Sequence, residues 1–323
     1  MTPRFKILTA ALLCAAAPLR AETPAFSMPL DCTLGDSCYI QQFVDHDPGP
    51  GARDFTCASL TYDGHKGTDF AVPSIAAMQA GVEVLSLAPG RVTATRDGMI
   101  DRLYRPEHDA EMDGRDCGNG IMIDHGDGWT AQYCHMARGS VRVQKGDVLE
   151  RGAPLGRVGL SGRTQFPHLQ VTIRRDGKVV DPFDPDGRIT CGAPSEDTLW
   201  ADPIAYVPGG LISLGFSSRV PAFDAIKSGT ANEAITPQTG ALVLWGYAFG
   251  GRTGDVMSLT LTGPLGEIIS NDARLDKTQA QFFRAAGRRL KADRWPPGTY
   301  TGTVTLTRGA ATIDTETTSF DLE

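Results

Sequence analysis

Apolar and polar residues alternate over many short runs of the chain, and few stretches show the 3.6-residue period of an amphipathic helix. Alternation with a period of two is typical of a strand that buries one face. Between residues 60 and 185 the strands predicted in this way are Val82–Leu87, Gly90–Thr95, Gly120–Asp124, Trp129–Cys134, Ser140–Val143 and Leu169–Arg174. Gly126-Asp127-Gly128 and Arg175-Asp176-Gly177-Lys178 are hairpin signals. The pattern predicts one compact antiparallel β domain over residues 60–185.

The same alternation returns near the C-terminus, at Ala241–Ala248, Val256–Thr262, Glu267–Ser270 and Thr299–Thr307. We therefore expect a mainly β protein whose antiparallel core domain is followed by a small β-sandwich over residues 209–323. The irregular residues 186–208 predict a linker between the two. The aromatic residues Trp245, Tyr247, Phe249 and Tyr300 are either sandwich core, the more common role at strand spacing, or a sugar-stacking face.

The N-terminal residues have the layout of a secretory signal peptide, which we expect over residues 1–21. Two basic residues precede an apolar run that begins at Ile7 and ends near Pro18. This run is too short to cross a membrane, and no later segment is longer and equally apolar, so we expect no stable membrane insertion. The protein is expected to be exported, either to a bacterial periplasm or outside the cell.

Six cysteines remain once Cys14 in the apolar run is set aside: Cys32, Cys38, Cys57, Cys117, Cys134 and Cys191. An even number in an exported chain favours disulfides, and three are expected. No Cys-x-x-Cys pair is present, which argues against a thiolate zinc site. Cys32 with Cys38 and Cys117 with Cys134 are the pairings with local support. Residues 22–59, with three of these cysteines, predict a disulfide-pinned N-terminal segment.

The net charge of the chain argues against nucleic acid as a binding partner. The chain has 323 residues and a formal net charge of −7. A nucleic-acid-binding protein usually carries a basic stripe, so no nucleic-acid partner is expected.

Three segments contain residue types suited to a metal centre. Asp63–Phe70 places His65 and Asp69 four apart beside glycines, and an imidazole with a carboxylate can begin a tetrahedral zinc site. A turn in which His65 simply hydrogen-bonds Asp69 is the alternative. His135 ends a predicted strand, where a histidine is more often structural. His168 and Gln170 are two apart on another strand, so both side chains face one side.

In order, spacing and flanking residues, these segments resemble the lysostaphin/LytM-type zinc metallopeptidases, a family of murein endopeptidases. That family carries Gly-His-x-Gly-x-Asp, Tyr-x-His-Leu and Pro-His-Leu-His-Phe motifs. The resemblance implies that His65 and Asp69 bind one zinc ion and that His135 and His168 are the catalytic histidines beside a water on the metal. It also implies an endopeptidase that hydrolyses the peptide cross-links of peptidoglycan.

Gln170 departs from the family pattern, because the family has its third metal-ligating histidine there. The amide oxygen of glutamine is a neutral hard donor and suits zinc less well than imidazole. Three states remain open: weak zinc binding with Gln170 as a ligand, binding of another metal that accepts oxygen donors, or no metal. The alternative function is a catalytically degenerate module that binds peptidoglycan or regulates another cell-wall hydrolase.

Overall fold

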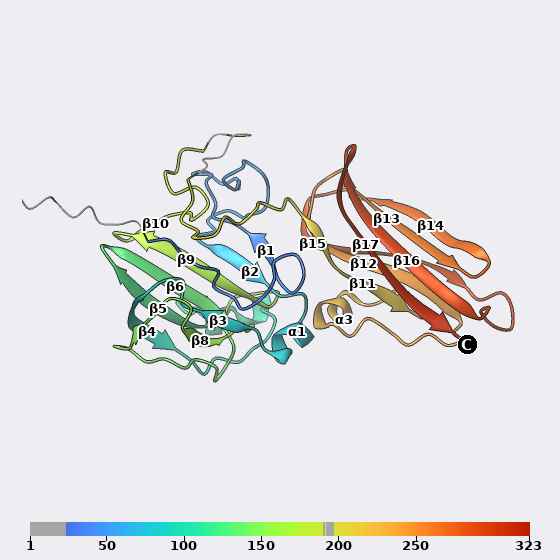
Figure 1. The fold of residues 1–323 in the computed structure, drawn as a ribbon, viewed down its shortest axis with the longest axis horizontal. Helices are drawn as coiled ribbons and strands as arrows, with labels where there is room; N and C mark the ends of the chain where they lie inside the picture. Colours follow the sequence, from blue (N-terminus) through green and yellow to red (C-terminus); the bar gives the residue numbers. More distant parts are fainter. Residues whose placement is uncertain (1–23, 190, 192–196) are drawn as a thin grey trace, which may run out of the picture.

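The computed structural model describes residues 24–189, 191 and 197–323, and the expected signal peptide lies outside them. The described chain forms two β units side by side, which are named here the N-terminal unit and the C-terminal sandwich (Figure 1). The mainly β, antiparallel fold expected from the sequence is confirmed. Within the described residues, no helix combines the length and apolar character needed to cross a membrane.

An eight-stranded antiparallel sheet is the centre of the N-terminal unit. Its strands, in spatial order, are β1 (Tyr39–Gln42), β2 (Thr68–Ala71), β9 (His168–Arg175), β6 (Trp129–Met136), β5 (Asn119–Gly126), β4 (Gly90–Arg96) and β7 (Val148–Leu149), with β10 (Lys178–Val179) also paired to β9. A separate ribbon pairs β3 (Glu83–Leu85) with β8 (Pro154–Arg157). Short helices α1 (Ile75–Ala80), η1 (Pro106–His108) and α2 (Asp109–Met112) lie in the connections.

Both predicted hairpins form where the sequence places them. Asp127 and Gly128 have φ of 49° and 80°, and Asp176 and Gly177 have φ of 50° and 79°. Two successive positive φ angles match the twist of the flanking strands, and Asp-Gly tolerates them best. The second hairpin joins β9 to β10.

The predicted strand Ser140–Val143 does not form. The alternation of apolar and polar residues does correspond to burial, because Val141 and Val143 pack against the core. The backbone is instead held as a loop: the Val141 amide donates to Asp97 Oδ2 at 3.2 Å, and the Arg142 amide donates to the Leu155 carbonyl at 3.0 Å. A carboxylate therefore takes a hydrogen bond that a neighbouring strand would otherwise have made.

All six cysteines outside the signal segment are paired. Cys32–Cys38 and Cys117–Cys134 are the two pairings with local support, and Cys57–Cys191 is the third. The third links residues 134 positions apart and ties the loop before β2 to the segment after β10.

Removing the long-range disulfide should destabilise the protein more than removing the short one. We expect Cys57→Ala/Cys191→Ala to lower the free energy of unfolding by about 2–5 kcal/mol, because the bond restricts a long loop in the unfolded chain. Cys32→Ala/Cys38→Ala, which opens a loop with a sequence separation of only 6, is the matched control. Urea unfolding measures both, and an equal or smaller loss in the first variant would contradict the expectation.

The C-terminal sandwich stacks two antiparallel sheets. One contains β11 (Gly210–Ser217), β12 (Ala241–Gly251) and β15 (Gln279–Arg289); the other contains β14 (Gly266–Arg274), β13 (Val256–Gly263), β16 (Gly298–Arg308) and β17 (Ala311–Leu322). Helix α3 (Phe223–Ser228) lies beside α1 at the junction with the N-terminal unit (Figure 1). Trp245, Tyr247, Phe249 and Tyr300 are all buried, so they are core residues and not a sugar-stacking face.

Candidate functional site

The sheet order brings the three histidine-containing segments together. Asp69 on β2 pairs with Gln170 on the neighbouring strand β9, and Gln170 pairs on its other side with Cys134, next to His135. His65 lies in the loop before β2, and His168 begins β9. All five residues predicted from the sequence therefore lie at one end of three adjacent strands. The four titratable ones are nearly inaccessible to solvent, with exposed fractions of 2% for His65, 2% for Asp69, 4% for His135 and 4% for His168.

His65 is held from both sides of its ring. Its Nδ1 lies 2.6 Å from the Phe43 carbonyl and its Nε2 lies 3.1 Å from Asp69 Oδ1. The ring stacks on Tyr62 with centroids 4.4 Å apart. Burial disfavours the charged ring, but the charge and hydrogen bond of Asp69, with the Phe43 carbonyl, raise the pKa of His65 above its usual range.

His168 and His135 face the same carboxylate region from the other strands. His168 Nδ1 donates to the Phe166 carbonyl at 2.9 Å, and its Nε2 lies 3.5 Å from Asp69 Oδ1. His135 Nδ1 donates to the Ser161 carbonyl at 2.8 Å, and its ring centroid lies 4.6 Å from that of His168.

Burial has different consequences for the four titratable groups. It lowers the pKa of His168, and together with the nearby His168 ring it lowers the pKa of His135 to about 4. Burial alone would raise the pKa of Asp69, but the facing imidazoles of His65 and His168 bring it below its usual range. At neutral pH the site thus holds an ionised carboxylate and two neutral imidazoles, His135 and His168.

All three imidazoles share one arrangement: Nδ1 is directed at a backbone carbonyl. A carbonyl at this nitrogen fixes the proton there and leaves Nε2 as the functional atom, which is usual for metal-binding and for catalytic histidines. His135 reaches this orientation from a strained backbone, since its φ is 64°. Left-handed backbone in a residue with a Cβ is costly and is concentrated at functional sites.

The donor set fits zinc only in part. His65 and Asp69 are suitable ligands, but in the described part of the chain no three His, Cys, Asp or Glu side chains are arranged to hold a metal ion. The third position offers only the neutral amide of Gln170. One imidazole, one carboxylate and one amide suit a divalent metal that accepts oxygen donors better than they suit zinc.

A cleft of about 620 Å³ opens over Asp69, His135 and His168. Its lining also contains residues that the sequence did not single out: Gln42, Tyr62, Tyr104, Arg163, Thr164, Gln165 and Phe166 from the N-terminal unit, and Phe223, Lys227 and Lys277–Gln281 from the C-terminal sandwich. Arg163 and Phe166 are adjacent to the His168 motif, so proximity could have suggested them. No local pattern distinguishes Lys277 from any other turn lysine.

The remaining histidines have structural roles. His46 Nε2 lies 2.8 Å from Asp181 Oδ2, and His125 Nδ1 donates to the Pro89 carbonyl at 2.8 Å. His108 is partly exposed in η1, where its Nδ1 accepts a hydrogen bond from the Arg105 amide at 3.1 Å. None of the three lines the cleft.

Comparison with known proteins finds a family whose model matches the stretch that contains the site. Residues 63–182 match the model of peptidase family M23. This stretch contains all five site residues.

Curated relatives share this part of the chain. Peptidoglycan DD-endopeptidase ShyB of Vibrio cholerae is 25% identical over 175 residues, which are 54% of this chain and 32% of the relative. Peptidoglycan DD-endopeptidase ShyA of the same organism is 29% identical over 117 residues, which are 36% of this chain and 22% of the relative. The chain thus spans less than a third of the length of either relative.

Solved structures also resemble part of the chain. A putative peptidase M23 from Pseudomonas aeruginosa is 26% identical, with a TM-score of 0.28, and the match covers 44% of this chain and 49% of that one. A zinc-containing peptidase from Vibrio cholerae is 23% identical, with a TM-score of 0.29, and the match covers 45% and 39%.

Proposed function

We propose that this protein is an exported endopeptidase that hydrolyses peptide cross-links in peptidoglycan. One observation carries the proposal: three buried imidazoles, each fixed through Nδ1 to a backbone carbonyl, surround an ionised Asp69 within the segment that matches peptidase family M23. Burying four titratable side chains is costly unless they are paired, and a pure scaffold has no need of them. The three disulfides agree with export.

In this proposal His65, Asp69 and Gln170 hold one divalent metal ion, zinc being the ion used by the family it resembles. A bound metal would polarise the scissile carbonyl and make water more acidic. His135 and His168 remain neutral at pH 7 because burial lowers the pKa of both. Each can therefore accept a proton at Nε2 from the attacking water and return one to the departing amine. The Ser161 and Phe166 carbonyls keep the Nδ1–H tautomer that this requires.

The division of the chain supports the same proposal. A peptidase domain over residues 60–185 would be preceded by the disulfide-containing segment 22–59, and joined by the linker 186–208 to an accessory sandwich over 209–323. Strand β1 of the preceding segment pairs with β2, so that segment completes the catalytic sheet.

Digestion of isolated peptidoglycan tests the activity. We expect the protein, supplied with a divalent metal, to release peptides with new free amino groups, and Asp69→Asn to release none. Separation of the products by mass identifies the bond. Intact cross-links after incubation with zinc, manganese and cobalt in turn would contradict the proposal.

A second function is favoured by two observations: Gln170 stands at the third ligand position, and His65 contacts Asp69 directly at 3.1 Å. In this alternative the domain needs no metal. It either binds peptidoglycan in its cleft or regulates another cell-wall hydrolase. Binding of peptidoglycan without cleavage, unchanged by a chelator, would favour it over the first function.

A further inference from the structure

The C-terminal sandwich is fixed to the edge of the catalytic sheet by a partly buried polar network. Gln281 Nε2 on β15 donates to Gln41 Oε1 at 2.9 Å and to the Tyr39 hydroxyl at 3.1 Å. Gln41 Nε2 donates to the Ala280 carbonyl at 2.9 Å, and Gln41 is fully buried. The Tyr39 ring packs on Phe249, with centroids 4.6 Å apart. Amides that satisfy one another at a contact out of bulk water hold the two units in one register.

This contact places part of the sandwich beside the metal-ligand strand. Strand β1 pairs with β2, and Gln42 is opposite Asp69. The segment Lys277–Gln281, attached to β1 through Gln41, lines the cleft over Asp69, as do Phe223 and Lys227 of α3. One wall of the proposed substrate cleft therefore belongs to the C-terminal sandwich.

Cationic side chains outnumber carboxylates in the cleft lining, although the whole chain has a net charge of −7. Its charged side chains are one carboxylate, Asp69, and three cations, Arg163, Lys227 and Lys277. Arg163 is already neutralised by Asp109 at 2.7 Å and by Asp116.

The two lysines of the sandwich are less fully engaged. Lys227 Nζ lies over the Phe223 ring, 5.1 Å from its centroid, and 3.5 Å from the exposed Asp224. Lys277 is exposed, and no carboxylate of the described residues lies within ion-pair distance of it.

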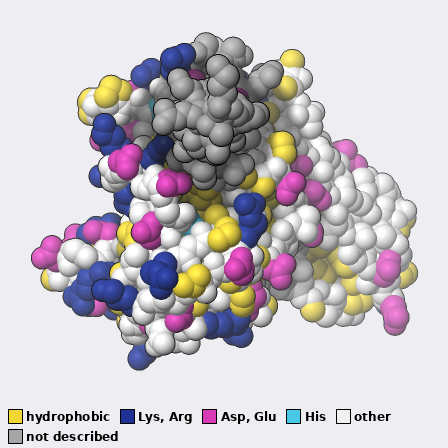
Figure 2. Space-filling model, turned by 60° about the vertical axis from the view of Figure 1, so that its left-hand side comes forward, with side chains coloured by type: hydrophobic (Ala, Val, Ile, Leu, Met, Phe, Trp, Pro, Cys, Tyr) yellow, Lys and Arg dark blue, Asp and Glu magenta, His cyan; other side chains and the backbone are white. Residues whose placement is uncertain are grey.

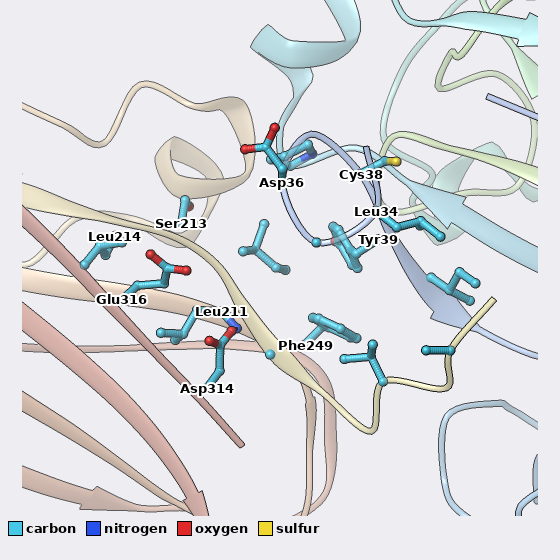
Figure 3. A pocket seen from close by; sticks show the side chains of 17 residues that line it. Leu34, Asp36, Cys38, Tyr39, Leu211, Ser213, Leu214, Phe249, Asp314 and Glu316 are labelled. Carbon is cyan, nitrogen blue, oxygen red and sulfur yellow. The ribbon is translucent and has the colours of Figure 1, made fainter. Parts of the chain in front are cut away.

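The other pocket at the junction of the two units has negatively charged side chains in its lining. That pocket, of about 400 Å³, is lined by Asp36, Asp314 and Glu316 around an apolar surface and contains no lysine or arginine (Figure 3). Positive charge is therefore a feature of the cleft and not of the junction as a whole. Elsewhere, Figure 2 shows basic and acidic side chains mixed over the N-terminal unit, while the visible face of the sandwich carries mainly acidic charges among uncharged atoms.

We propose that the C-terminal sandwich forms one wall of the substrate cleft and that Lys277 and Lys227 bind a free carboxylate of the peptide. The inference rests on the proposed function, because peptidoglycan stem peptides carry free carboxylates. A lysine ammonium on a flexible stem recognises such a group as a point charge. The accessory unit would then select substrates by charge, and peptides whose carboxylates are amidated would bind weakly.

Equilibrium binding of an uncross-linked stem tetrapeptide tests this, with its carboxylates either free or amidated, using the full-length mature protein. We expect the wild type to bind the free form at least about fivefold more tightly, as for two ion pairs of the surface type. Lys227→Gln/Lys277→Gln should abolish the preference and leave binding of the amidated form unchanged. Raising the salt concentration should weaken the preference in the wild type.

The matched control is Lys145→Gln/Lys291→Gln, which removes the same charge at two exposed lysines outside the cleft. The control should retain the preference, and the single variant Lys277→Gln, in an exposed turn, should lose part of it without any folding defect. Equal binding of both peptides by the wild type, or an unchanged preference in the double cleft variant, would overturn the inference while leaving the proposed function intact. If the wild type bound neither peptide, this inference would fail, whereas the proposed function is refuted only by intact cross-links in the peptidoglycan digestion.

Discussion

Replacing Gln170 with histidine is expected to raise zinc affinity by about 100-fold or more, since even substitutions outside the ligand shell change affinity by roughly 10–100-fold. Position 170 is on β9 directly opposite Asp69, so an imidazole there would complete a set of two histidines and one carboxylate. The rate of peptidoglycan cleavage should increase together with the zinc affinity. Competition with a chromophoric chelator measures the affinity.

Gln165→His is the matched control for Gln170→His. Gln165 also lines the cleft but lies in the loop before β9, so a histidine there adds an imidazole without completing the ligand set. Equal gains in the two variants would mean that any extra imidazole near the cleft binds zinc, and that position 170 has no special role.

His168→Ala is expected to lower the rate of peptidoglycan cleavage by about 10²–10⁴-fold, the usual contribution of a positioned acid–base group. The bound metal should stay within about twofold of the wild type, because the proposed ligands are His65, Asp69 and Gln170 and not His168. The reaction is followed by the appearance of free amino groups, and metal content by elemental analysis of the same preparation.

His108→Ala controls for loss of a histidine as such, since His108 is partly exposed in η1 and lies outside the cleft. It should cleave at the wild-type rate. Loss of metal together with activity in His168→Ala would reassign His168 as a ligand, a role for which its Nε2, 3.5 Å from Asp69, is close enough.

The local chemistry of the site could be predicted from the sequence because each part of it is encoded over a few residues. His65 and Asp69 are four apart, and His168 and Gln170 share one face of a strand. The Asp-Gly pairs at 127–128 and 176–177 determined their hairpins because few other residues accept successive positive φ angles. Predictions of this kind need no knowledge of the rest of the chain.

Long-range features were not predictable in the same way. The pairing of Cys57 with Cys191 depends on how the loop before β2 and the segment after β10 meet in space. Strand β17 is rich in threonine and has little apolar alternation, so its own sequence does not predict a strand. Its extended structure depends on hydrogen-bonded pairing with β16. Lys277 lines the cleft because the two units contact each other, through a set of contacts that includes Gln281 with Gln41.

The central claim is that His65 and Asp69 hold a divalent metal with which the protein cleaves peptidoglycan. The most direct test is the metal content and zinc affinity of the purified mature wild type beside His65→Ala. The account predicts that the wild type holds about one metal ion per chain. It predicts that His65→Ala loses both the metal ion and the cleavage of peptidoglycan. A wild type that takes up no zinc, manganese or cobalt, and whose binding to peptidoglycan equals that of His65→Ala, would contradict it.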